Sequence, residues 1–150
     1  MSLKLWKAPE LVPSLAYQDV VKAVDWLERA FGFRERSEAR LTWAGGCRAF
    51  MEIGNVLINL STAGGHELHS PASGGSVHVA LKVYVDDVDR HFQRAKAAGA
   101  TIVSELEDGF WGGRIYRAKD LEGHHWVFSQ KGRDLASENW RLPPGLKRGR

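Results

Sequence analysis

Hydrophobic and polar residues follow a pattern that occurs twice along this chain of 150 residues. Residues 10–33 and residues 77–100 each contain a strand-like run, an Asp-Val pair, a helix-like run and a closing glycine. Because these landmarks have nearly the same spacing in both stretches, they predict a duplicated β-α unit. Two similar modules in one small domain direct attention to a pocket where the halves meet.

The first predicted module covers residues 11–61. Residues 11–17 can form a strand, which Pro13 restricts to an edge or to a strand start. Asp19 suits the N-cap of the following helix, and Gly32 suits its C-terminal end. The helix has apolar residues at helical spacing: Val20, Ala23, Val24, Leu27 and Phe31. Three further strands are expected at about 34–43, 47–53 and 55–61.

A Gly- and Ser-rich linker over residues 62–76 precedes the second predicted module, which covers residues 77–130. Strict alternation from Val77 to Val85 predicts a strand with one apolar and one polar face. Asp87 should cap the next helix and Gly99 should close it. Strands near 100–105, 113–119 and 124–130 complete a second β-α-β-β-β module.

Composition limits the class of protein. Hydrophobic content of 43% and charged content of 26% fit one globular domain spanning residues 1–150. No apolar run approaches the roughly 20 residues that span a bilayer, and the first residues lack the apolar region of a secretory signal. The lone Cys47 fits a reducing compartment, so a cytoplasmic location is expected. The net charge of +3 is concentrated in the basic tail, residues 131–150, and no nucleic-acid-binding module is present.

Two groups of polar and aromatic residues are candidates for a ligand site. His78, Lys82 and Tyr84 share the polar face of the predicted 77–85 strand, which faces either solvent or a cavity. The duplication favours a cavity. In residues 110–114, Trp111 beside Arg114 offers a stacking and anion-binding surface, although Trp111 could instead pack at the domain edge.

Four stretches in order carry a family resemblance. They are residues 17–20 continuing through 30–33; residues 54–60; residues 83–89; and residues 111–114 followed by 120–124. Together they resemble the vicinal oxygen chelate superfamily of glyoxalases, bleomycin-resistance proteins and dioxygenases. The resemblance implies an α+β fold in which two tandem βαβββ modules form a curved mixed sheet around a central pocket, and frequently a homodimer.

The resemblance also implies where a metal would bind, because metal-dependent members place one His, Gln or Glu in each of four strands. The matching positions here are Val12, Asn59, Ala80 and Val127. Valine and alanine cannot ligate a metal, so no metal and no cofactor are expected. A register shift that recruits His78 and His125, with Glu52 or Glu105 as a third ligand, is the alternative.

Three functional hypotheses follow. The favoured one is a metal-independent protein that binds an aromatic or amphipathic small molecule. The alternative is a lyase, isomerase or dioxygenase with a non-standard metal site, and a third is an oligomeric scaffold whose cavity is filled by side chains. The candidate ligand-binding residues are Trp43, Asn59, His78, Lys82, Tyr84, Trp111, Arg114, Tyr116 and His125. The tail either wraps over a partner subunit, anchored by Trp140, or is disordered.

Overall fold

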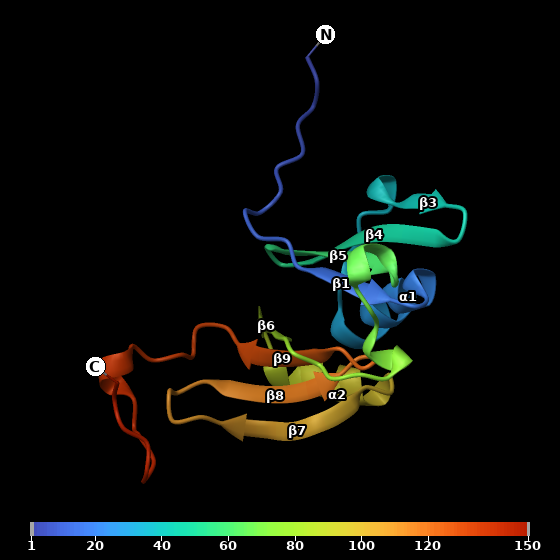
Figure 1. Ribbon diagram of the computed structural model, residues 1–150. Coiled ribbons are helices and arrows are strands. Elements are labelled where there is room, and N and C mark those ends of the chain that lie inside the picture. Colours follow the sequence, from blue (N-terminus) through green and yellow to red (C-terminus); the bar gives the residue numbers. More distant parts are fainter. Residues whose placement is uncertain (1, 150) are drawn as a thin grey trace. The chain divides into compact units, whose positions relative to one another are not determined.

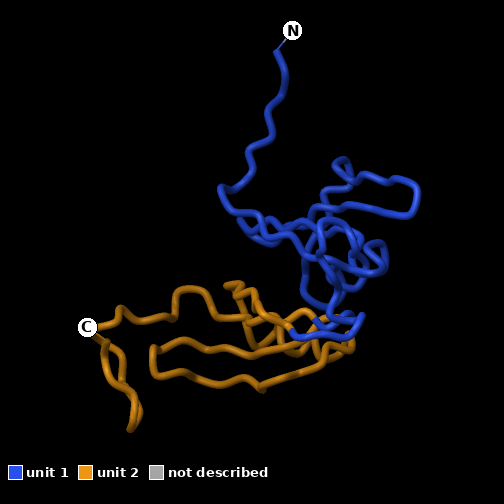
Figure 2. The backbone as a smooth tube through the Cα atoms, in the orientation of Figure 1, with its two compact units in different colours: residues 1–76, 121–123 blue, residues 77–120, 124–150 orange. Residues whose placement is uncertain are grey.

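The computed structural model describes residues 2–149, so Met1 and the last residue of the basic tail, Arg150, lie outside it. The chain forms two compact units (Figure 2). Unit 1 comprises residues 1–76 together with 121–123, and unit 2 comprises residues 77–120 and 124–150. Each unit contains one α-helix and one mixed sheet, which gives the α+β class and the two βαβββ halves expected from the repeat.

Unit 1 begins with an extended arm and then forms its sheet and helix (Figure 1). Its elements are β1 (Ser14–Tyr17), α1 (Val20–Phe31), β2 (Arg34–Glu35), β3 (Leu41–Trp43), β4 (Gly46–Ile53) and β5 (Val56–Thr62). The strand order is β1-β5-β4-β2, with β3 also paired to β4. Strand β1 runs parallel to β5, and the other pairs are antiparallel.

Unit 2 repeats this arrangement. Its elements are β6 (Ala80–Val85), α2 (Val88–Ala97), β7 (Thr101–Asp108), β8 (Arg114–Lys119) and β9 (His125–Gln130). The strand order is β6-β9-β8-β7, and β6 runs parallel to β9 just as β1 runs parallel to β5. Within the described residues, neither helix has the length and apolar composition needed to cross a bilayer.

The predicted helix boundaries are confirmed by their capping bonds. The Asp19 carboxylate accepts from the Lys22 amide, and the Asp87 carboxylate accepts from the Arg90 amide, at 3.0 Å in both cases. Such caps satisfy amides that the first helical turn leaves without partners. Gly32 ends α1 in the left-handed conformation, at φ 77°. Helix α2 ends at Ala97 with Ala98 as its C-cap, one residue before the predicted Gly99, which follows with φ 94°.

Three predicted strands are shorter in the structure, and the first of them, 11–17, begins only at Ser14. The 34–43 strand is interrupted by a 3-10 turn at Ser37–Ala39, which lies beside a double hydrogen bond from Arg40 to Glu35. The 77–85 strand begins only at Ala80, because its partner β9 begins at His125, the residue that pairs with Ala80. The alternation of apolar and polar residues therefore extends to residues 77–79, which have no partner strand in β9.

The buried face of each sheet packs against the helix of its own unit. In unit 1 the buried strand residues on this face are Leu15, Tyr17, Cys47, Ala49, Met51, Ile58 and Leu60. In unit 2 they include Val83, Val85, Tyr116, Ala118, Trp126 and Phe128. Because side chains alternate across a strand, these residues fix which of their neighbours must point to the opposite face.

A buried carboxylate organises the start of α1. Glu122 belongs to unit 1, and its side chain accepts hydrogen bonds from the amides of Gln18 (2.7 Å) and Asp19 (3.0 Å) and from the hydroxyl of Ser70. Only 8% of Glu122 is exposed. The same carboxylate thus joins the turn between β1 and α1 to the middle of the linker, where Ser70 is also buried. A buried acceptor with three donors is costly to remove.

Replacing Glu122 with alanine should lower the free energy of unfolding by about 3 kcal/mol, because two amides and a hydroxyl lose their acceptor in a buried place. Urea unfolding followed by circular dichroism measures this change. Glu107→Ala is the control, because Glu107 lies on an exposed strand and forms only a 3.7 Å surface pair with Arg117. It should change stability by about 0.5 kcal/mol or less. Equal effects of the two substitutions would contradict the organising role of Glu122.

Candidate ligand-binding site

The sheet of unit 1 presents a second face, opposite α1, on which polar and aromatic side chains gather. Strand register places Ser14 beside Asn59 on β1 and β5, and Arg48 beside Ser61 on β4 and β5. Strand β3 adds Leu41, which pairs with Arg48. These side chains share one face because side chains alternate along a strand, and the residues between them point to the buried face.

Arg48 is held at this face by a chain of hydrogen bonds. Its Nε donates to Asn59 Oδ1 at 3.2 Å, and Asn59 Nδ2 donates to Ser14 Oγ at 2.6 Å. The guanidinium also lies over the Phe50 ring, 5.4 Å from its centroid. Asn59 is only 4% exposed, so its orientation is fixed by its surroundings. The predicted ligand residue Asn59 therefore positions the arginine.

Trp43 ends strand β3 and lies across the backbone of the facing strand. A Cβ added to Gly46 would stand 2.3 Å from Trp43 Nε1, so only glycine leaves room for the indole in this position. Trp43 is nevertheless 52% exposed. One part of the ring is thus set against the hairpin while the rest remains available for contact with another molecule.

These residues line a cavity of about 380 Å³, here called the sheet pocket. Its lining residues are Ser14, Ala16, Leu41, Trp43, Arg48, Asn59, Ser61, Thr62, Gly65, His66 and Leu68. The loop that follows β5 contributes the last three, and His66 and Glu67 take positive φ values of 51° and 63°. Positive φ is uncommon for residues other than glycine and is found often at functional sites.

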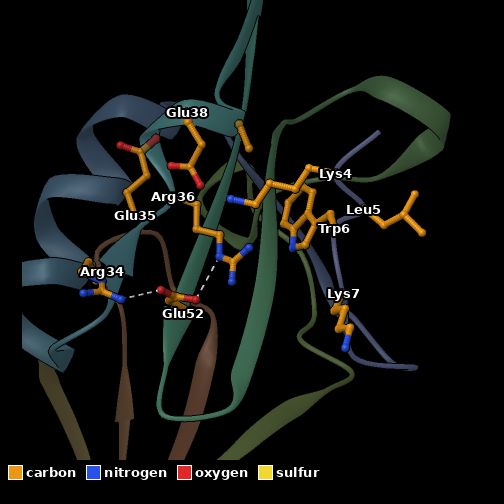
Figure 3. A pocket seen from close by; sticks show the side chains of 10 residues that line it. Lys4, Leu5, Trp6, Lys7, Arg34, Glu35, Arg36, Glu38 and Glu52 are labelled. Carbon is orange, nitrogen blue, oxygen red and sulfur yellow. Dashed lines mark hydrogen bonds and ion pairs between the residues drawn. The ribbon is translucent and has the colours of Figure 1, made fainter. Parts of the chain in front are cut away.

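A larger hollow of about 790 Å³ lies between the N-terminal arm and strands of unit 1 (Figure 3). Its centre is Glu52, which accepts from Arg34 at 2.7 Å and from Arg36 at 3.0 Å. These hydrogen bonds hold the pKa of Glu52 below its ordinary value. Trp6 of the arm meets Phe50 edge to face at 4.8 Å. Because both arginines at its centre are already hydrogen-bonded to Glu52, they are less available to a ligand than Arg48 of the sheet pocket.

In unit 2, Lys82, Tyr84 and Trp111 lie close together. Lys82 Nζ lies 5.1 Å from the centroid of Tyr84 and 5.6 Å from that of Trp111, within cation–π range. The Tyr84 hydroxyl donates to Asp134. Trp111 rests on glycine backbone, since a Cβ at Gly113 would lie 2.1 Å from its Nε1. Trp111 therefore packs on its own loop while remaining beside Lys82.

Two predicted ligand residues, Arg114 and Tyr116, are on the wrong side of the sheet of unit 2. Arg114 forms ion pairs with Asp89 of α2 (2.8 Å) and with Asp108 (3.2 Å). Its hydrogen bonds lower the pKa of Asp89. Tyr116 is fully buried, which raises its pKa, and its hydroxyl meets His91 Nδ1 at 2.6 Å. Tyr116 is therefore inaccessible to a ligand, and Arg114 is held by two aspartates.

The basic tail packs on the loop between β7 and β8 of its own unit. The Leu135 amide donates to the Trp111 carbonyl at 2.7 Å, and the Arg141 amide donates to the Phe110 carbonyl at 3.1 Å. The Trp140 ring meets Phe110 edge to face at 5.8 Å. Trp140 thus packs the tail against its own chain, an arrangement that was not among the alternatives predicted from the sequence.

The residues available as metal ligands do not fit the metal chemistry of the family. Asn59 accepts from the cationic side chain of Arg48, which disfavours a metal ion at the same oxygen. In unit 2, His125 pairs with Ala80 and Lys119, while His78 is exposed and precedes β6. Glu52 is occupied by two arginines, and Glu105 is exposed. Within residues 2–149, no three His, Cys, Asp or Glu side chains are grouped to hold a metal.

Several pocket residues were not singled out from the sequence. Arg48 carried a signal, because the Gly54-Asn55 turn sets the register that brings it near Asn59. Leu41 was hidden inside a predicted strand that proved to be broken. His66 and Leu68 belong to a loop, whose course no periodic pattern reveals.

Comparison with known proteins agrees with the fold and the repeat. The family model described as "Glyoxalase/Bleomycin resistance protein/Dioxygenase superfamily" matches residues 11–128. An uncharacterised protein of Mycobacterium bovis, Mb0911c, is 34% identical over 132 residues, which cover 85% of this chain and 86% of the relative.

Two solved structures extend the comparison. TioX from Micromonospora sp. ML1 has 39% sequence identity and a TM-score of 0.65, covering 85% of this chain and all of TioX. The fosfomycin resistance protein FosX from Listeria monocytogenes has a TM-score of 0.63 and covers 89% of this chain and 98% of its own, but at 17% identity it shows the fold alone. With a duplicated βαβββ architecture and a family match over most of its length, the chain belongs to the glyoxalase/bleomycin resistance protein/dioxygenase superfamily.

Proposed function

We propose that this protein binds an aromatic or amphipathic small molecule in the sheet pocket and that binding requires no metal. The observation that carries the proposal is a cavity of about 380 Å³ that combines a half-exposed tryptophan with an arginine held in place by Asn59. Ligand sites in proteins are typically cavities of about 300–1,000 Å³, largely apolar, with a few placed polar groups. The sheet pocket has this character.

The apolar lining supports a flat ligand. Leu41, Trp43 and Leu68 are 57%, 52% and 47% exposed, although large apolar side chains are favourably buried. A ligand that covers them removes apolar surface from water, at about 25 cal/mol per Å². The indole of Trp43 offers a planar surface for stacking, and Arg48, held in position by Asn59, supplies a polar contact.

A second surface in unit 2 is also proposed to contact a ligand. This surface is formed by the aromatic side chains of Tyr84 and Trp111 and the cationic side chain of Lys82. His78 and His125 are proposed as further polar groups that can contact the ligand.

We further propose that the chain is one domain of the family type, that it is cytoplasmic and that it does not bind nucleic acid.

Trp43→Ala should weaken binding of a fluorescent naphthalene probe about tenfold, because the stacking surface is lost. Tryptophan fluorescence titration measures the affinity. Trp140→Ala is the matched control, since Trp140 lies in the tail of unit 2, and it should leave the affinity unchanged.

Gly46→Ala is a second variant for the same prediction. Its added methyl group meets the Trp43 ring, which is free to swing outward, so the affinity should fall while the fold is retained. Full affinity in both Trp43→Ala and Gly46→Ala would show that the probe binds elsewhere.

Binding of the same probe should be unaffected by chelation. The expected result is less than about 0.1 transition-metal ion per chain after dialysis and an unchanged dissociation constant with excess EDTA, because Arg48 disfavours a cation beside Asn59. Elemental analysis and a repeated titration measure the two quantities. Near-stoichiometric metal together with EDTA-sensitive binding would favour a lyase, isomerase or dioxygenase with an unusual ligand set.

A homodimer is also expected. Each sheet ends in an edge strand within its own unit, β1 in unit 1 and β6 in unit 2, and edge strands carry unpaired backbone groups that favour pairing with another chain. Light scattering after size exclusion should give twice the chain mass of 16.7 kDa. A mass of one chain at all concentrations tested would remove this prediction.

A further inference from the structure

Arg48 is unlike the other arginines of unit 1. Arg29, Arg34, Arg36 and Arg40 each form an ion pair with a nearby aspartate or glutamate. Within residues 2–149, Arg48 has no carboxylate partner, and its one hydrogen bond is that from Nε to neutral Asn59. A positive charge that the surrounding protein leaves uncompensated is a natural place for an anion.

The surroundings of Arg48 have no negative charge to compete with a ligand. No aspartate or glutamate is among the residues that line the sheet pocket. The other polar side chains in the lining carry no negative charge, and they are Ser14, Asn59, Ser61, Thr62 and His66. Electrostatics therefore favour an anionic group in this cavity over a neutral or cationic one.

The geometry also selects the shape of the anion. Because Nε is engaged by Asn59 and the guanidinium lies over the Phe50 ring, rotation of the side chain is restricted. The two terminal nitrogens of an arginine held in this way form a planar fork, which matches the two oxygens of a carboxylate. Trp43 lines the same cavity and offers the planar apolar surface.

We propose that the sheet pocket is specific for planar aromatic carboxylates, whose carboxylate is bound by Arg48 and whose ring stacks on Trp43. This assignment rests on the proposed binding function and adds to it the class of ligand and the residue that selects it. Asn59 is a positioning residue, because it acts on the ligand through Arg48.

The test compares 2-naphthoate with its neutral analogue 2-naphthamide, which has the same ring system and nearly the same size. The unmodified protein should bind the carboxylate at least about tenfold more tightly than the amide, because hydrogen bonds to charged groups are the stronger ones. Arg48→Met should remove this preference, because it should weaken binding of the carboxylate by a larger factor than binding of the amide. Arg48→Lys should keep part of the preference, since it keeps the charge and loses the fork.

Arg29→Met is the matched control. It removes the same charge from unit 1, but Arg29 lies at an exposed position of α1 in an ion pair with Asp25. The preference for the carboxylate should therefore persist. Equal affinity for naphthoate and naphthamide in the unmodified protein, or an unchanged preference in Arg48→Met, overturns the carboxylate assignment while the binding function stands. If neither compound binds, the proposed function itself is overturned.

Discussion

The alternation of side chains along β1, β4 and β5 is the constraint on which the rest of this account depends. One face of the sheet must bury Tyr17, Met51 and Leu60 against α1, because that is where the apolar surface of unit 1 lies. Because those residues point toward the helix, Ser14, Arg48 and Asn59 must point to the opposite face of the sheet. The pocket is therefore a consequence of core packing, and a slip of one residue in register would destroy both together.

The same constraint acts in unit 2 with a different result. There the residues that point toward α2 include Arg114 as well as Tyr116, because the two are separated by one position on β8. Arg114 can reach Asp89 on the helix, so its charge is neutralised within the protein. Arg48 of unit 1 faces away from its helix and meets an amide in place of a carboxylate. Two arginines in related sheets thus serve different ends: one supports the fold and the other remains available to a ligand.

Much of the fold could be predicted from the sequence, because its signals are local and strong. The Asp19 and Asp87 caps, the Gly32 helix end and the alternation in β6 all depend on residues close together in the chain. Strand β8 was predicted close to its observed bounds, but Ile115, Tyr116 and Ala118 are all buried, so apolar residues occur on both faces and the pattern does not show which face lies against the helix. That single ambiguity explains why Arg114 and Tyr116 were both misplaced. The wall of the sheet pocket could not be predicted, since His66 and Leu68 occupy a loop shaped by backbone turns.

The most direct test of the account is to observe Trp43 while a ligand binds. The six tryptophans each give an indole N–H signal in a ¹H–¹⁵N correlation spectrum, and Trp43→Phe identifies the one that belongs to Trp43. On titration with 2-naphthoate, the account predicts a progressive shift of the Trp43 signal while the signals of buried Trp126 and of Trp140 in the tail stay in place. A titration in which 2-naphthoate binds and the Trp43 signal does not move would contradict the claim that the sheet pocket is the ligand site.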